Sequence, residues 1–119
     1  MRYDPGLIAK AKQEEWRGKL IEAADIVRKR GLCKGTLEDE DGRVCLRGAL
    51  NAVYWGSPVA LLIGCNSNGR IFVDGQVLRY LRSRGFIPVT TAHWNNEPER
   101  TAEEVIDVLE GAAFMDMAP

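Results

Sequence analysis

The chain has 119 residues, a length typical of one domain with one hydrophobic core. Its composition, 45% hydrophobic and 28% charged, is that of an ordinary globular protein, and 16 Lys and Arg residues against 17 Asp and Glu residues give a net charge of -1. This balance excludes a bulk electrostatic attraction to nucleic acid or membrane, so a nucleic-acid role would need a local basic patch.

The longest apolar run, PVALLIG at 58–64, is far shorter than the roughly 20 residues that span a bilayer, and the N-terminus lacks the apolar segment of a secretory signal. We therefore expect a soluble, cytoplasmic protein. The three cysteines Cys33, Cys45 and Cys65 are an odd number without such a signal, which favours reduced thiols over a bridge between Cys33 and Cys45.

The first strong pattern is an amphipathic helix over residues 6–31. Pro5 suits its first turn and Gly31 suits its end, while Gly18 weakens its middle and marks a candidate break. The apolar stripe that should face the core consists of Leu20, Ile21, Ala23, Ala24 and Val27.

The next segment, LCKGTLEDEDGRVCL at 32–46, contains Asp41-Gly42, which predicts a tight turn between short strands or extended arms. The acidic run at 38–41 is expected to be a solvated loop tip, because the spacing of a divalent-ion loop is absent. From Leu46 the pattern LRGALNAVYW predicts a short core helix in which Gly48 permits a close approach by another backbone.

Residues 59–65, VALLIGC, fit a helix or a strand, with a slight preference for strand, and NSNGR at 66–70 predicts a turn. DGQVLRYLRSRG at 74–85 predicts a helix capped by Asp74 and ended by Gly85. FIPVTTAHW at 86–94 is expected to be extended, because proline disfavours helix and Val and Thr favour extended chain.

The closing helix begins at a capping box, in which the Thr101 hydroxyl accepts from the Glu104 amide and the Glu104 carboxylate accepts from the Thr101 amide. Trp94 is expected to cover the first turns of this helix, with Asn95 and Asn96 as turn residues. The predicted buried stripe is Val105, Val108, Leu109 and Ala112.

These elements predict a mainly α (α+β) fold, a compact single domain over residues 1–119 with about four helices and short extended or β segments. The termini, residues 1–5 and 114–119, are expected to be flexible.

Three stretches, GLCKG at 31–35, DGRVCLRGALNAV at 41–53 and WNNEPERTAEEVIDVLEGAA at 94–113, together resemble an uncharacterised family of small proteins found in actinobacteria and their phages, a domain of unknown function. That family has a Gly-x-Val-Cys-x-x-Gly-Ala box and a Trp-Asn-Asp-x-Pro-x-Arg-Thr box. The motif residues that the resemblance carries over are Cys45, Gly48, Ala49, Trp94, Asn95, Pro98, Arg100 and Thr101. Asn96 departs from the family's Asp. The resemblance implies a fold and a phage or prophage origin, but no activity.

Cys45 at a helix start, with His93 as base and Asn95 or Asn96 as orienter, has the inventory of a cysteine hydrolase. The apolar neighbours of Cys45 favour a buried structural cysteine instead. A zinc site from three cysteines and one histidine is disfavoured because the paired C-x-x-C spacing is absent, and we expect no metal and no cofactor.

Two binding hypotheses remain. Arg70, Arg79, Arg82 and Arg84 give the 74–84 helix a modest basic face, with Arg79, Arg82 and Arg84 as the candidate nucleic-acid contacts, although a solvated helix face is the simpler reading. The absence of a convincing catalytic site and the apolar tail FMDMA at 114–118 favour a protein-interaction module, and the resemblance implies a partner from the bacterial host or the phage. We therefore expect protein binding, with DNA binding as the alternative and a cysteine hydrolase third.

Overall fold

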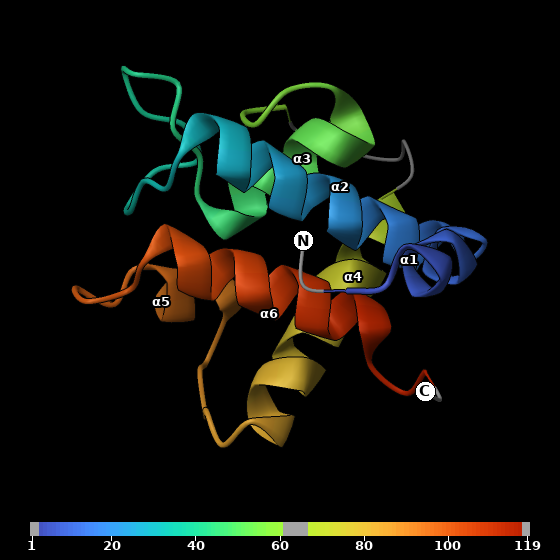
Figure 1. The fold of residues 1–119 in the computed structure, drawn as a ribbon. Coiled ribbons are helices and arrows are strands. Elements are labelled where there is room, and N and C mark those ends of the chain that lie inside the picture. The colour runs from blue at the N-terminus through green and yellow to red at the C-terminus, as the bar shows by residue number, and fades with distance from the viewer. Residues whose placement is uncertain (1–2, 61–66, 118–119) are drawn as a thin grey trace.

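The computed structural model describes residues 3–60 and 67–117, which contain six α-helices and isolated β-bridges (Figure 1). The helices are α1 (Pro5–Lys12), α2 (Glu15–Arg30), α3 (Leu46–Trp55), α4 (Ser67–Ser83), α5 (Thr91–Asn95) and α6 (Ala102–Phe114). The mainly helical fold in one domain is confirmed. The expected number of about four helices is too low, since the first helix is divided and α5 lies in a segment predicted to be extended.

The centre of the fold is the pair α2 and α6, which lie side by side and run in opposite directions (Figure 1). The α3 helix packs against α2, and α4 packs against α6. Both predicted apolar stripes are confirmed as buried. The residues concerned are Leu20, Ile21, Ala23, Ala24 and Val27 of α2, and Val105, Val108, Leu109 and Ala112 of α6.

Two polar contacts fasten α2 to α6. The Arg17 guanidinium donates to the carbonyl oxygens of Ala113 and Met115, at 2.9 and 2.7 Å, and so satisfies acceptors at the end of α6. The buried Glu110 carboxylate accepts from Arg28 at 2.6 Å, and this hydrogen bond raises the pKa of Arg28. A charge in the core is tolerated here because its partner lies on the facing helix.

The N-terminal helix divides at Gln13 and Glu14, and not at Gly18. The backbone of Glu14 is extended, with ψ 119°, and the chain turns there before α2 begins. A Cβ added at Gly18 would lie 3.6 Å from Lys12 Cα, so this glycine faces the preceding helix at the elbow. Gly18 therefore marks a contact between the two helices and not the break itself.

Residues 31–45, called here the arm, connect α2 to α3 without forming strands. Two isolated bridges replace the predicted pair of strands: Leu32 with Val44 in parallel and Glu38 with Val44 in antiparallel orientation. Gly42 has φ 81° and forms the predicted turn. Val44 takes part in both bridges, so the arm folds around this residue instead of pairing as two strands.

The α4 helix begins at Ser67, seven residues before the predicted start at Asp74. The prediction of a turn at 66–70 is wrong for its described residues, because Ser67, Asn68, Gly69 and Arg70 belong to the helix. Asp74 therefore lies inside the helix and pairs with other side chains. The end is as predicted, with Gly85 at φ 92° just beyond Ser83. Of the ambiguous stretch at 59–65, residues 61–65 lie outside the described residues.

The segment at 86–94 is only partly extended. Its second half forms α5, because the Thr90 side chain accepts a hydrogen bond from the His93 amide at 2.9 Å and caps a helical turn. The preference of Thr and Val for extended chain did not decide the outcome here. Near the termini, the Tyr3 ring stacks on Phe114 with centroids 4.1 Å apart, and Met117 packs against the core.

Candidate functional site

The two motif boxes meet at Asn95, which is completely buried in α5. Its side-chain oxygen accepts from the amide of Leu46 at 3.0 Å, and its side-chain nitrogen donates to the carbonyl of Cys33 at 3.1 Å. One amide thus satisfies an unpaired N–H at the start of α3 and holds the arm at the same time. We call this contact region the motif junction.

Cys45 and Gly48 form the α3 side of the junction. Cys45 is buried as expected, and its sulfur accepts from the amide of Gly48 at 3.3 Å, so the thiol acts as the N-cap of α3. A Cβ on Gly48 would overlap the carbonyl of Leu37, which explains why the arm can cross α3 only at a glycine. Ala49 is buried beside it.

The second box forms the other side of the junction. Trp94 is buried, and the Arg100 guanidinium lies over its ring at 3.9 Å while donating to the Trp94 carbonyl at 3.0 Å. Thr101 and Glu104 form the predicted capping box, which is confirmed. The exposed Pro98 contributes its carbonyl, which accepts from Lys34 of the arm at 2.7 Å.

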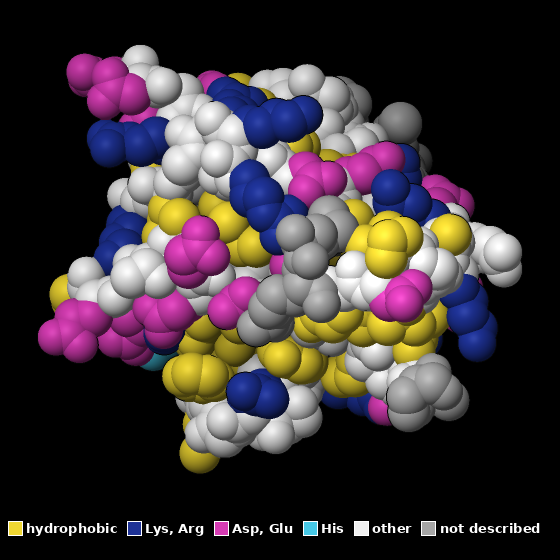
Figure 2. Space-filling view, in the orientation of Figure 1, with side chains coloured by type: hydrophobic (Ala, Val, Ile, Leu, Met, Phe, Trp, Pro, Cys, Tyr) yellow, Lys and Arg dark blue, Asp and Glu magenta, His cyan; other side chains and the backbone are white. Residues whose placement is uncertain are grey.

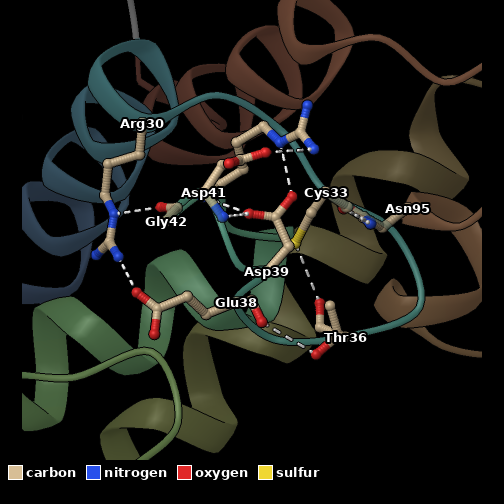
Figure 3. A network of polar contacts seen from close by, with 9 residues as sticks. Arg30, Cys33, Thr36, Glu38, Asp39, Asp41, Gly42 and Asn95 are labelled. Carbon is tan, nitrogen blue, oxygen red and sulfur yellow. Dashed lines mark hydrogen bonds and ion pairs between the residues drawn. The ribbon is translucent and has the colours of Figure 1, made fainter.

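The arm itself is held by ion pairs and hydrogen bonds (Figure 3). Arg30 donates to the carbonyl of Gly42 at 2.7 Å and also pairs with Glu38, while Asp39 accepts from the backbone amides of Asp41 and Arg43 at 3.0 and 2.9 Å. The acidic loop tip is thus partly occupied by the chain's own cations and amides.

The arrangement of these side chains does not support the cysteine hydrolase hypothesis. His93 is exposed, and Asn95 already uses both of its polar atoms on Leu46 and Cys33. Burial raises the pKa of the Cys33 thiol, which disfavours its reactive thiolate form. Cys33 and Cys45 are both free thiols, and Cys65 is not among the described residues.

A buried polar cluster joins α3, α4 and α5. Arg70 donates to Asn51 at 2.8 Å, Thr91 donates to Asp74 at 2.7 Å, and Arg47 reaches both Thr91 and Asp74, at 3.1 and 3.3 Å. Burial lowers the pKa of Arg70. The sequence analysis places Arg70 on an exposed basic face. This prediction is wrong, because Arg70 is 7% exposed and its guanidinium donates to Asn51 inside the fold.

A second arginine of the predicted basic face is also engaged within the protein. Arg79 pairs with Asp116 at 2.6 Å. Arg82 and Arg84 are exposed, and neither forms an ion pair within residues 3–60 and 67–117. Of the predicted row, Arg82 and Arg84 are therefore the cations without an ion pair in the described parts of the chain, and the Arg84 guanidinium lies 6.0 Å from the centre of the Tyr80 ring.

Directly after these two arginines, apolar side chains project from the surface. Ile87 is 93% exposed, Val89 is 79% exposed, and Phe86 is partly exposed, while Pro88 between them is buried. In Figure 2 the corresponding lower edge of the molecule, where Figure 1 shows the end of α4 and its connection to α5, carries hydrophobic side chains around a basic one. We call Arg82, Arg84, Phe86, Ile87 and Val89 together surface 82–89.

A small hollow of about 170 Å³ lies beside surface 82–89, between α4 and α6. Its walls are formed by Tyr80, Trp94, Val108 and the acidic residues Glu104 and Asp107, together with Phe86 and Arg84 of surface 82–89. The Phe86 ring meets the Trp94 ring edge to face, with centroids 6.0 Å apart, so Phe86 is in contact with the second motif box.

Sequence reasoning predicts an extended chain at 86–89 but does not single it out as a site. The available signal is the run Phe86-Ile87-Pro88-Val89, which is apolar in a segment for which no partner strand is predicted. Exposure is a tertiary property, and nothing in the local pattern tells an exposed valine from a buried one.

No group of three or more His, Cys, Asp or Glu side chains in the described residues could hold a metal ion. None of the described helices is both long enough and apolar enough to cross a membrane.

The fold and the junction define a small helical domain in which two sequence boxes hold an arm against α3 and α5. The chain belongs to a family of unknown function: the model of the Family of unknown function (DUF6197) matches residues 12–114, which include both boxes. No curated protein and no solved structure matches the chain.

Proposed function

We propose that this chain acts by binding another protein through surface 82–89. The observation that carries the proposal is the exposure of Ile87 and Val89, at 93% and 79%. Burying an aliphatic side chain of this kind contributes about 1.5 to 3 kcal/mol, so these two alone supply a useful part of a binding free energy. A cluster of exposed apolar side chains bordered by charges is typical of a protein-interaction site.

The segment is also held in place before binding. The Phe86 amide donates to the Leu81 carbonyl at 3.0 Å, the Phe86 ring packs on Trp94, and Pro88 is buried. A contact segment that is already ordered loses less conformational entropy when it binds. The motif junction thus serves surface 82–89 as its support.

The test is affinity capture with quantitative mass spectrometry. The resemblance to small actinobacterial and phage proteins suggests bacterial lysate, from uninfected and phage-infected cells, as the source of the partner. Wild type and the double variant Ile87→Ser/Val89→Ser are compared, and we expect the variant to lose a protein that wild type retains.

The matched control is Ile71→Ser, which also removes an exposed aliphatic side chain, 68% exposed, but from the first half of α4. Capture that is unchanged in the double variant contradicts the proposal. Equal loss in the control and the double variant means that general stickiness is responsible, and this also contradicts it.

Nucleic-acid binding is a second candidate, favoured only by the free cations Arg82 and Arg84 at the end of α4. Two cations allow a few phosphate contacts but no visible reading of base edges. Protein binding explains the apolar part of the same surface, and nucleic-acid binding does not.

A further inference from the structure

Cys33 and Cys45 lie beside each other in the arm. The amide of Val44 donates to the carbonyl of Gly31 at 3.0 Å, and the amide of Cys33 donates to the carbonyl of Val44 at 2.9 Å. These two hydrogen bonds form the parallel bridge between Leu32 and Val44. One residue further along each segment, Cys33 is therefore paired with Cys45.

The two cysteine side chains leave the same face of this short pairing. Successive side chains of an extended chain point to opposite faces, and both Leu32 and Val44 pack in the core. Cys33 and Cys45 therefore both point to the other face. Paired segments lie about 4.8 Å apart, and a disulfide needs Cα atoms about 4.4 to 6.8 Å apart. The pairing thus gives the spacing of a disulfide without a large movement of the backbone.

The electrostatics of the thiols agree with this placement. Burial is the main cause that raises the pKa of Cys33, and the negative charge of a Cys45 thiolate is the second. This influence exceeds those of the Asp39 and Arg43 charges, which border the same segment. Because the Coulomb energy falls with distance, the two sulfur atoms are close neighbours.

Each thiol has a hydrogen-bond partner in the reduced state. The Cys33 sulfur donates to the carbonyl of Thr36 at 3.4 Å (Figure 3), and the Cys45 sulfur accepts from the amide of Gly48 at 3.3 Å. Sulfur is a weak donor and a weak acceptor, so giving up these contacts costs little. Both cysteines are free thiols, and oxidation starts from this reduced state.

Both cysteines also border hollows in the surface. Cys33 lines a hollow of about 610 Å³, and Cys45 lines another of about 190 Å³. The two residues themselves are only 7% and 6% exposed. The larger hollow admits a small oxidant to Cys33, whereas the low exposure disfavours contact with a cysteine of another protein molecule.

We infer that Cys33 and Cys45 are a reversible oxidation site, at which a low-molecular-weight disulfide converts the two thiols into a bridge. The thiolate of one cysteine attacks the small disulfide, forms a mixed disulfide and releases one small thiol. The thiolate of the other cysteine then attacks the protein sulfur of the mixed disulfide, and the second small thiol leaves. The two protein thiols lose two electrons and two protons, and the small disulfide takes them up. The bridge closes the arm into a loop at the start of α3 and does not involve surface 82–89.

The experiment equilibrates the folded chain, and the chain unfolded in urea, with a fixed concentration of reduced glutathione and rising concentrations of oxidised glutathione. Trypsin cleaves after lysine and arginine, which releases Cys33 in the peptide GLCK at 31–34 and Cys45 in the peptide VCLR at 44–47. After the remaining thiols are alkylated, mass spectrometry measures the fraction of these two peptides that a disulfide joins.

We expect half-maximal joining at a concentration of oxidised glutathione about tenfold or more lower for the folded chain than for the unfolded chain, because the fold already holds the cysteines at bridging distance. Dithiothreitol should restore the free thiols, and the bridged chain should keep its helical circular dichroism. An equal or higher concentration for the folded chain overturns the inference. Loss of the helical signal on bridging also overturns it, because the bridge then forms in the unfolded chain.

Two matched variants, Cys65→Ser and Cys33→Ser, each remove one thiol. Cys65→Ser should bridge at the same concentration of oxidised glutathione as wild type, and Cys33→Ser should leave Cys45 unjoined at that concentration. A chain in which Cys65 replaces Cys33 as the partner of Cys45 overturns the inference. A glutathione adduct on Cys33 that never gives way to the joined peptides overturns it as well.

Discussion

The Trp94 ring packs against both the Phe86 ring and the Arg100 guanidinium, and its indole nitrogen is buried without a hydrogen-bond partner in the described residues. Its contribution to stability is therefore packing. Trp94→Ala should lower the free energy of unfolding by about 3 to 5 kcal/mol, and Trp94→Phe should cost clearly less because no hydrogen bond is lost. Chemical denaturation of both variants measures this. A loss for Trp94→Phe as large as that for Trp94→Ala would contradict packing of the ring as its main contribution, and no loss in either would mean that Trp94 faces solvent.

Gly48 gives a second prediction at this scale. Gly48→Ala places a methyl group against the Leu37 carbonyl, which is backbone and cannot turn aside, so the arm must move. Gly75→Ala is the matched control, since it also lies within a helix but an added Cβ would meet nothing within 4 Å. Thermal melts should show Gly48→Ala strongly destabilised and Gly75→Ala unchanged or stabilised by about 0.5 to 1 kcal/mol. A Gly48→Ala protein as stable as its control contradicts the close crossing.

The capping box of Thr101 and Glu104 makes part of the stability of the fold depend on pH. Hydrogen bonding from the backbone amide of Thr101 is the main cause that lowers the pKa of Glu104. A carboxyl group whose folded pKa is lowered stabilises the fold above its unfolded pKa, and this contribution is lost as the pH falls through the folded value. Glu104→Gln should therefore be less stable than wild type at neutral pH, with the difference shrinking below about pH 4. A difference that stays constant across this range contradicts the capping box as its source.

Among the elements, the closing helix is the most predictable from sequence. Its capping box is a local pattern, and Thr101 and Glu104 form it as expected. The less predictable elements depend on distant contacts. Asn68-Gly69 is a turn signal by local preference, yet both residues lie in α4, whose Arg70 bonds to Asn51 of α3.

The candidate site also has one part that the sequence predicts and one part that depends on distant contacts. The sequence boxes single out Cys45, Gly48 and Asn95, and the structure brings these residues together. The exposure of Ile87 and Val89 is not visible in the sequence, because it depends on which face of the fold remains uncovered. The boxes thus identify the support of the surface more readily than the surface itself.

The end of α4 carries a prediction about nucleic acid. With Arg70 buried and Arg79 paired to Asp116, only Arg82 and Arg84 remain for phosphate contacts. Any DNA binding should therefore be weak, with a small salt slope of about two released ions, and Arg82→Ala/Arg84→Ala should remove it. Fluorescence anisotropy with a duplex at several salt concentrations measures the slope. Tight binding at physiological salt that survives the double substitution would establish a different nucleic-acid surface.

At the scale of the molecule, the motif junction and surface 82–89 are joined through Trp94, whose ring contacts both Arg100 and Phe86. The motif junction need not itself touch a partner, since its role in this account is to hold residues 86–89 in a fixed position.

The most direct test of this account is hydrogen–deuterium exchange of the chain alone and in complex with the protein that it captures. The account predicts new protection confined to residues 84–94 and the adjoining turns of α4 and α6, with exchange in the arm at 31–45 unchanged. Protection confined to the arm, with residues 86–89 exchanging as in the free chain, would contradict it and would make the motif junction the binding site.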